Sequence, residues 1–368
     1  MTNSTLVSNS HSNPVLHVPQ ICRGLACLFV ALFHGITLVG SWYGVVPLSG
    51  LYNFGFFGVH LFFVISGLII LHAHYADIGH YKNIGHYLSK RIIRIYPLYL
   101  IVLIVWGGWR VFTGRLGIAE FLTNALFFSS DKKLIIPVAW TLAYELVFYL
   151  SFVTLIISKR LGLAVFAAWA GLVAFDVLHN VSDLPLFNLQ NALFIIGMVA
   201  AVTLRTLRRR LSIRLQDICA YVFAASSLVL FVLITRYCAV LSHHGTVPID
   251  VWGDPIITLG YGCASALLLL TALSGRVEHF VRRQTPLVAV GNASYSIYLV
   301  HVQIQRIVFN ATRPLDWLWL EKTPLAANLL LVLVLAASVA AGIIIHKLLE
   351  KPLLNAGRKL LARTKVTA

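Results

Sequence analysis

Two ionisable residues stand in the first long apolar stretch of this chain, Arg23 near its start and His34 near its end. Their spacing of eleven residues completes about three turns of an α-helix, so both side chains share one face, about 16 Å apart along the axis. Such residues usually face a bundle interior or a wet cavity. The pair would place an anion-binding guanidinium and a proton-accepting imidazole on one face. The same pattern would arise if Arg23 only anchored the helix at the lipid interface and His34 were a hydrogen-bonded core residue.

A second candidate site is the basic cluster Lys90, Arg91 and Arg94, directly before an apolar run. Arg91 and Arg94 are three residues apart and share a helical face, so together they can bind a phosphate or pyrophosphate. Chain orientation and contact with lipid phosphates would also explain such a cluster.

Glu145 is the one carboxylate well inside an apolar run. A carboxylate in that position needs a partner, or it protonates. We expect His34 or an arginine to be that partner, because a carboxylate hydrogen-bonded to an imidazole fixes its tautomer and stabilises its charged form. The alternative is an ion pair with a structural role only.

The apolar stretch 287–310 is unusually polar for a membrane span. Tyr298, His301 and Gln305 follow one another at helical spacing and form a single stripe, which predicts that this helix lines a cavity. Arg306, nearer the outer end, could meet a polar acceptor. Hydrogen bonding between helices would explain each of these residues singly.

No metal site is predicted. His243, His244, Asp250 and Asp254 lie near one another in the sequence, but their spacing fits no familiar ligand pattern. The cysteines also lack paired spacing and stand in or beside apolar runs, which is typical of buried thiols.

The elements that must position these residues are membrane helices. The chain is 59% apolar and 11% charged, whereas soluble domains carry roughly a quarter charged residues. Repeated apolar runs near 20 residues predict an all-α, polytopic membrane protein. We expect about ten spans, at 20–40, 55–73, 95–113, 139–158, 161–178, 186–204, 218–240, 255–274, 287–310 and 325–348. The piece 118–128 is too short to cross, and glycines of the second span (Gly55, Gly58 and Gly67) permit close helix approach.

Loop charges orient this topology. With both termini in the cytoplasm, 20 Lys and Arg lie on the inner side and 7 on the outer side, as the positive-inside rule requires. The net charge of +16 therefore reflects membrane orientation, and no nucleic-acid partner is expected. We predict a disordered cytoplasmic tail at 1–19, one membrane domain at 20–349 and a basic cytoplasmic tail at 350–368.

Six stretches in chain order resemble the membrane acyltransferase-3 family, whose members acylate bacterial exopolysaccharides, O-antigens and Nod factors. The resemblance covers nearly the whole chain, although His60 stands where the family often has an acidic residue. The matching stretches are the Arg23–His34 pair, GVHLFFVISG, KRIIRIYPLY, WTLAYELVFY, SYSIYLVH and the closing Glu350, Lys351 and Pro352.

This resemblance implies a multi-pass O-acetyltransferase of the bacterial inner membrane. It would use cytoplasmic acetyl-CoA, or another acyl-CoA, and acylate a hydroxyl of a saccharide or lipid-linked saccharide. His34 would be the general base, with Glu145 orienting it or balancing its charge, because an imidazole with an ordinary pKa of about 6.5 suits base catalysis at neutral pH. The donor-binding residues would be Arg23, Lys90, Arg91 and Arg94, and the substrate-binding residues Trp140, Tyr295, Tyr298, His301 and Arg306.

A transporter or flippase of polyprenol-linked saccharide is the alternative, since buried charges and a polar helix would serve it too. No inverted repeat is visible, and flipping needs no histidine at a set distance from an arginine. A structural subunit of an export complex fits the buried ionisable residues least. An oligomer is compatible with the sequence.

Overall fold

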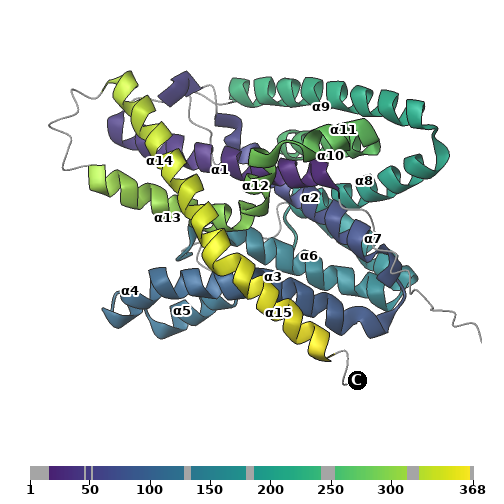
Figure 1. Ribbon diagram of the computed structural model, residues 1–368, viewed down its shortest axis with the longest axis horizontal. Coiled ribbons are helices and arrows are strands. Elements are labelled where there is room, and N and C mark those ends of the chain that lie inside the picture. The colour runs from purple at the N-terminus through teal and green to yellow at the C-terminus, as the bar shows by residue number, and fades with distance from the viewer. Residues whose placement is uncertain are drawn as a thin grey trace, which may run out of the picture.

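The computed structural model describes residues 16–44, 47–50, 53–127, 134–179, 186–241, 253–312 and 323–364, and these contain helices and no β-strand (Figure 1). The predicted all-α class is confirmed. The α-helices are α1 (His17–Tyr43), α2 (Phe57–His74), α3 (Ile84–Leu103), α4 (Trp109–Phe112), α5 (Ile118–Ala125), α6 (Trp140–Ile157), α7 (Lys159–His179), α8 (Asn191–Arg210), α9 (Ile213–Leu241), α10 (Pro255–Leu270), α11 (Gly275–Arg282), α12 (Thr285–Asn292), α13 (Ser294–Thr312), α14 (Pro324–Ile345) and α15 (Lys351–Thr364).

Shorter helical turns join these helices. Those of 3₁₀ type are Pro47–Gly50, Asn53–Phe56, Tyr75–Asp77, Tyr81–Asn83, Pro137–Ala139 and Thr271–Leu273, and the two π-helical turns are η5 (Ile104–Gly108) and η11 (His346–Glu350).

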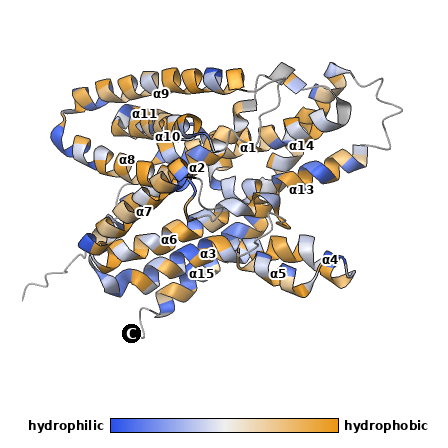
Figure 2. Ribbon diagram, turned by 180° about the vertical axis from the view of Figure 1, so that it is seen from behind, coloured by the Kyte–Doolittle hydropathy of each residue, from blue (hydrophilic) through white to orange (hydrophobic). Residues whose placement is uncertain are grey.

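The membrane prediction is confirmed. Within the described residues, nine helical stretches are long and apolar enough to cross a membrane, and α12 with α13 makes a tenth if that bent pair is one span. Helix α2 lies at the centre. In its most apolar segment of 18 residues, 78% of the residues are buried, whereas in the corresponding segment of α9 only 17% are buried. Figure 2 shows α9 hydrophobic along most of its length, with hydrophilic residues where α8 meets α9. The outer helices therefore present apolar side chains to lipid, and α2 is packed on all sides.

The prediction of one continuous helix at 287–310 is wrong. The chain breaks at Ala293, and α12 and α13 differ in direction by 73°. The bend lies where this segment crosses α1: a Cβ on Gly24 would lie 3.0 Å from the nitrogen of Gly291, and the Gln20 amide donates to Asn292 over 2.7 Å. Glycine and asparagine are common at helix ends, so Gly291 and Asn292 both allow the close crossing and end α12.

The third span also begins earlier than predicted. This span was predicted to begin at residue 95, but α3 begins at Ile84, so Pro97 lies well inside the helix. Residues such as Lys90 and Arg91 favour helix, so the helix forms ahead of the proline. Pro97 leaves only the carbonyl of Ile93 without its usual helical donor, a loss that a packed helix tolerates. The basic cluster is therefore part of a helix.

Glycines bring α2 against its neighbours, as predicted. A Cβ on Gly67 would meet the backbone carbonyl of Phe194 on α8, and a Cβ on Gly58 would meet the carbonyl of Ala26 on α1. Because backbone atoms cannot move aside as a flexible side chain can, neither position has room for a side chain.

We therefore expect Gly67→Ala to lower the stability of the folded protein by about 1–3 kcal/mol through overpacking. Thermal unfolding of the detergent-purified protein, followed by size-exclusion chromatography, measures this. Gly171→Ala on α7 is the matched control, because a Cβ there meets nothing within 4 Å. Equal melting temperatures for the two variants would contradict the close α2–α8 contact.

Candidate active site

A cavity with a volume of about 690 Å³ lies between α1, α2, α3, α6, α13 and α15. Positive side chains dominate its polar lining. All four residues predicted to bind the donor, Arg23, Lys90, Arg91 and Arg94, line it, together with Arg358, Glu145 and His86. The structure thus brings together the start of α1 and the basic turn of α3, which are about seventy residues apart. Repulsion among these cations favours an anionic ligand.

Helix α3 explains why its basic residues face the cavity together. Lys90 and Arg94 are four residues apart and Arg91 and Arg94 are three apart, so one helix face carries all three. Arg91 is held further by the rings of Tyr87 and Tyr149, whose centroids lie 5.9 and 5.7 Å from its guanidinium carbon. These contacts leave the guanidinium ordered at the cavity wall.

A buried histidine orients Arg91. An Arg91 N–H donates to Nε2 of His74 over 3.3 Å, and because a guanidinium can only donate, that nitrogen must be the acceptor. The Nδ1 of His74 therefore carries the proton and donates to Asp77 over 2.7 Å. Asp77 and His74 fix the direction of Arg91. The sequence analysis assigned neither Asp77 nor His74 to the site. Their separation of three residues, about one helical turn, was the signal that could have paired them.

Glu145 lies in the cavity wall on α6, and of the two expected partners, His34 or an arginine, it does not contact His34. It accepts hydrogen bonds from the hydroxyl of Tyr149, one turn along the same helix, and from Ser66 of α2 at 3.3 Å. The expected contact with His34 is not formed, because α6 packs beside α2 and α3, whereas the His34 side chain lies against α13. Glu145 does interact electrostatically with Arg23. Its charge therefore offsets part of the charge of Arg23.

His34 is paired with another histidine. Its Nδ1 lies 2.9 Å from the carbonyl of Val30 and 3.3 Å from Nε2 of His301. Since a carbonyl can only accept, Nδ1 of His34 carries the proton. His301 in turn donates from Nδ1 to the carbonyl of Tyr298 over 2.7 Å, which leaves its Nε2 as an acceptor for His34. This network gives His34 an unprotonated Nε2, the atom that a general base requires.

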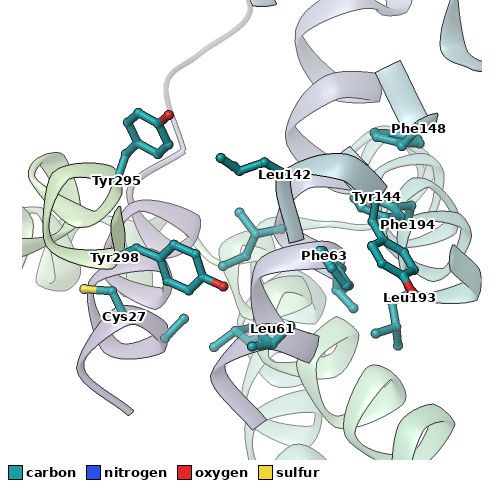
Figure 3. Close-up of a cluster of buried hydrophobic side chains, with 14 of the residues drawn as sticks. Cys27, Leu61, Phe63, Leu142, Tyr144, Phe148, Leu193, Phe194, Tyr295 and Tyr298 are labelled. Atoms are coloured by element: carbon teal, nitrogen blue, oxygen red, sulfur yellow. The ribbon is translucent and has the colours of Figure 1, made fainter. Parts of the chain in front are cut away.

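Tyr298 stands between the cavity and this histidine pair. Its side chain lines the cavity, its hydroxyl lies 3.0 Å from that of Thr141, and its ring centroid lies 5.8 Å from that of His301. Figure 3 shows the Tyr298 hydroxyl pointing into the space between Leu142 and Leu61. Neither His34 nor His301 is among the cavity-lining residues. Tyr298 therefore joins the cavity wall to this histidine pair through its ring contact with His301.

The remaining predicted substrate-binding residues do not all line the cavity. Tyr295 lines the cavity and donates to the carbonyl of Ile95 over 2.8 Å. Arg306 is exposed on the far part of α13 and interacts electrostatically with His34. Trp140 lies at the start of α6 against the rings of Phe63 and Tyr144, outside the cavity lining. Only part of this set therefore shares one surface.

Metal-ligating side chains do not gather in threes within the described part of the chain. Asp254 accepts a hydrogen bond from the N–H of Ile257 and so caps α10. His243, His244 and Asp250 lie outside the described residues.

Residues 18–347 match a protein family described as an acyltransferase domain. That stretch includes every predicted site residue and ends before α15. No curated protein and no solved structure matches this chain.

Proposed function

The chain belongs to the acyltransferase-3 family and is a multi-pass membrane protein, and we propose that it is an acyl-CoA-dependent O-acetyltransferase acting on a cell-surface saccharide. The observation that carries the proposal is the cationic cavity of about 690 Å³, whose lining residue Tyr298 contacts His301, the partner of His34. An anion-binding chamber beside a neutral imidazole with a free Nε2 suits transfer from a phosphate-bearing thioester donor to a hydroxyl.

The donor binds first by its phosphates. Arg91 and Arg94 on α3, with Lys90 and Arg23, bind the diphosphate and nucleotide end of acyl-CoA through charge-assisted hydrogen bonds. The pantetheine arm extends along α1 and places the thioester beside Tyr298. The positive-inside distribution of loop charges supports a cytoplasmic position for this end of the bundle, where acyl-CoA is made.

Transfer then takes place at the histidine pair. Nε2 of His34 accepts the proton of the acceptor hydroxyl while its oxygen attacks the thioester carbonyl. The tetrahedral intermediate collapses, the C–S bond breaks, and the proton held by His34 passes to the departing thiolate. Thr141 donates to the carbonyl of Val138, so the Tyr298 hydroxyl is the group that turns from these neighbours to donate to the thioester carbonyl oxygen. His301 accepts from Nδ1–H of His34 and holds the imidazole in the required tautomer.

The acceptor approaches from the opposite side. Arg306 is exposed beyond His34 on α13 and can bind a polar group of a saccharide or lipid-linked saccharide. Tyr295 and Trp140 complete the predicted set of substrate-binding residues. An acceptor that arrives from outside would be acylated at the bacterial inner membrane without crossing it.

Membranes that contain the protein, incubated with labelled acetyl-CoA and saccharide acceptor, test the proposal. We expect label in the saccharide, and mass spectrometry of surface polysaccharide should lose acetyl groups when the protein is absent. Relocation of saccharide without any change in acylation would identify a flippase instead and overturn the proposal.

A further inference from the structure

The C-terminal helix α15 forms one wall of the cavity. Leu354, Arg358, Leu361 and Ala362 line it, at positions i, i+4, i+7 and i+8, which is one continuous face of a helix. The family match ends at residue 347, before this helix begins. A segment that the sequence predicted to be a basic tail is therefore part of the cavity itself.

Helix α15 is packed closely on α3, the helix that carries the basic cluster. A Cβ on Gly357 would overlap the Ile93 side chain and lie 3.1 Å from Ile93 Cδ1, so this side chain of α3 packs directly against the Gly357 backbone. Figure 1 shows α14 and α15 as one long diagonal, with α15 crossing α3. Arg358, next to Gly357, thus faces the cavity beside the cations of α3.

A buried carboxylate determines where α15 begins. Glu350, 3% exposed, accepts from the Ser296 hydroxyl over 2.6 Å and lies 2.8 Å from Nδ1 of His346. It ends the π-helical turn η11, directly before Lys351 and Pro352. Pro352 has no N–H to donate, and the π turn ends two residues before it in the chain. Glu350 thereby ties the start of α15 to α13.

Arg358 has no hydrogen-bond or ion-pair partner among the described residues, whereas Arg91 is held by His74. A guanidinium beside three other cations repels them unless an anion binds between them. Cations on two separate helices, α3 and α15, suit a ligand with phosphates in two places, as coenzyme A has on its diphosphate and on its ribose.

We propose that Arg358 is a further donor-binding residue, which α15 supplies as the second phosphate-binding wall of the cavity. The inference rests on the proposed use of acyl-CoA as the donor. It predicts that loss of Arg358 weakens coenzyme A binding while the chemistry at His34 continues.

Equilibrium binding of radiolabelled coenzyme A to the detergent-purified full chain tests this, with acetyl transfer measured in parallel. We expect Arg358→Gln to weaken binding about tenfold, as for the loss of one charge-assisted hydrogen bond, and to raise KM for acetyl-CoA similarly at unchanged kcat. Arg358→Lys should recover part of the affinity because it keeps the charge. Lys359→Gln, which removes an exposed cation outside the cavity lining, should bind as the wild type does.

Arg358→Gln binding equal to that of Lys359→Gln would overturn the inference and leave the proposed function standing. A wild-type protein that does not bind coenzyme A would overturn both. A wild-type protein that binds coenzyme A but transfers no acyl group would overturn the proposed transferase reaction only, and the binding comparison would still decide the role of Arg358.

Discussion

His34→Ala is expected to lower kcat for acyl transfer by about 10²–10⁴-fold, the contribution typical of a general base. The physical reason is the hydrogen-bond network: Nδ1–H of His34 is engaged by the Val30 carbonyl and His301, so its Nε2 is the one site able to accept the hydroxyl proton. The measurement is transfer of label from acetyl-CoA at saturating donor, with the amount of inserted protein determined by size-exclusion chromatography.

His80→Ala is the matched control, because this histidine is exposed and lies outside the cavity lining. It should retain wild-type activity. His301→Gln keeps an acceptor for His34 and should retain more activity than His301→Leu, which has none. Full acetylation of the saccharide by His34→Ala would remove His34 from the reaction.

The double variant Arg91→Ala, Arg94→Ala is expected to raise KM for acyl-CoA at least about 100-fold, with a smaller effect on kcat. Each lost charge-assisted hydrogen bond costs about 1.5–3 kcal/mol, and a factor of ten corresponds to about 1.4 kcal/mol. Arg91 is already ordered by His74 and two tyrosine rings, so its binding to a phosphate sacrifices little conformational entropy.

Initial rates over a range of acetyl-CoA concentrations measure this effect. The double variant Arg209→Ala, Arg210→Ala is the control, since it removes the same charge from exposed positions at the end of α8, outside the cavity lining. If both double variants show the same donor dependence, the α3 cations do not bind the donor and serve chain orientation alone.

The class of the protein follows from its apolar runs. In lipid, every backbone N–H and C=O must be paired within the segment, so a run of span length has to be helical. Local spacing also placed residues correctly within single helices. The i, i+3 and i, i+4 relations of Lys90, Arg91 and Arg94 predicted a shared face, and all three line the cavity. The glycines of α2 predicted close packing, and carbonyls of neighbouring helices occupy the space beside Gly58 and Gly67.

Contacts between helices were predicted less well. Glu145 was expected beside His34 or an arginine. It hydrogen-bonds to Tyr149 and Ser66 and interacts electrostatically with Arg23, whereas His34 is paired with His301. Both histidines were singled out, yet their spacing of 267 residues carries no information about contact. Arg358 was counted only as a tail cation, although the spacing of Leu354, Arg358 and Leu361 could have indicated one helix face.

Composition and helical periodicity thus establish a helical membrane protein with an arginine and a histidine on one face of its first span, because these properties depend on residues within one or a few turns. The partner of each ionisable side chain, the bend at Ala293 and the course of α15 along α3 depend on which helices become neighbours. Packing of segments far apart in the chain determines that, through steric fit at glycines and the need to pair buried polar groups, and no local pattern encodes it.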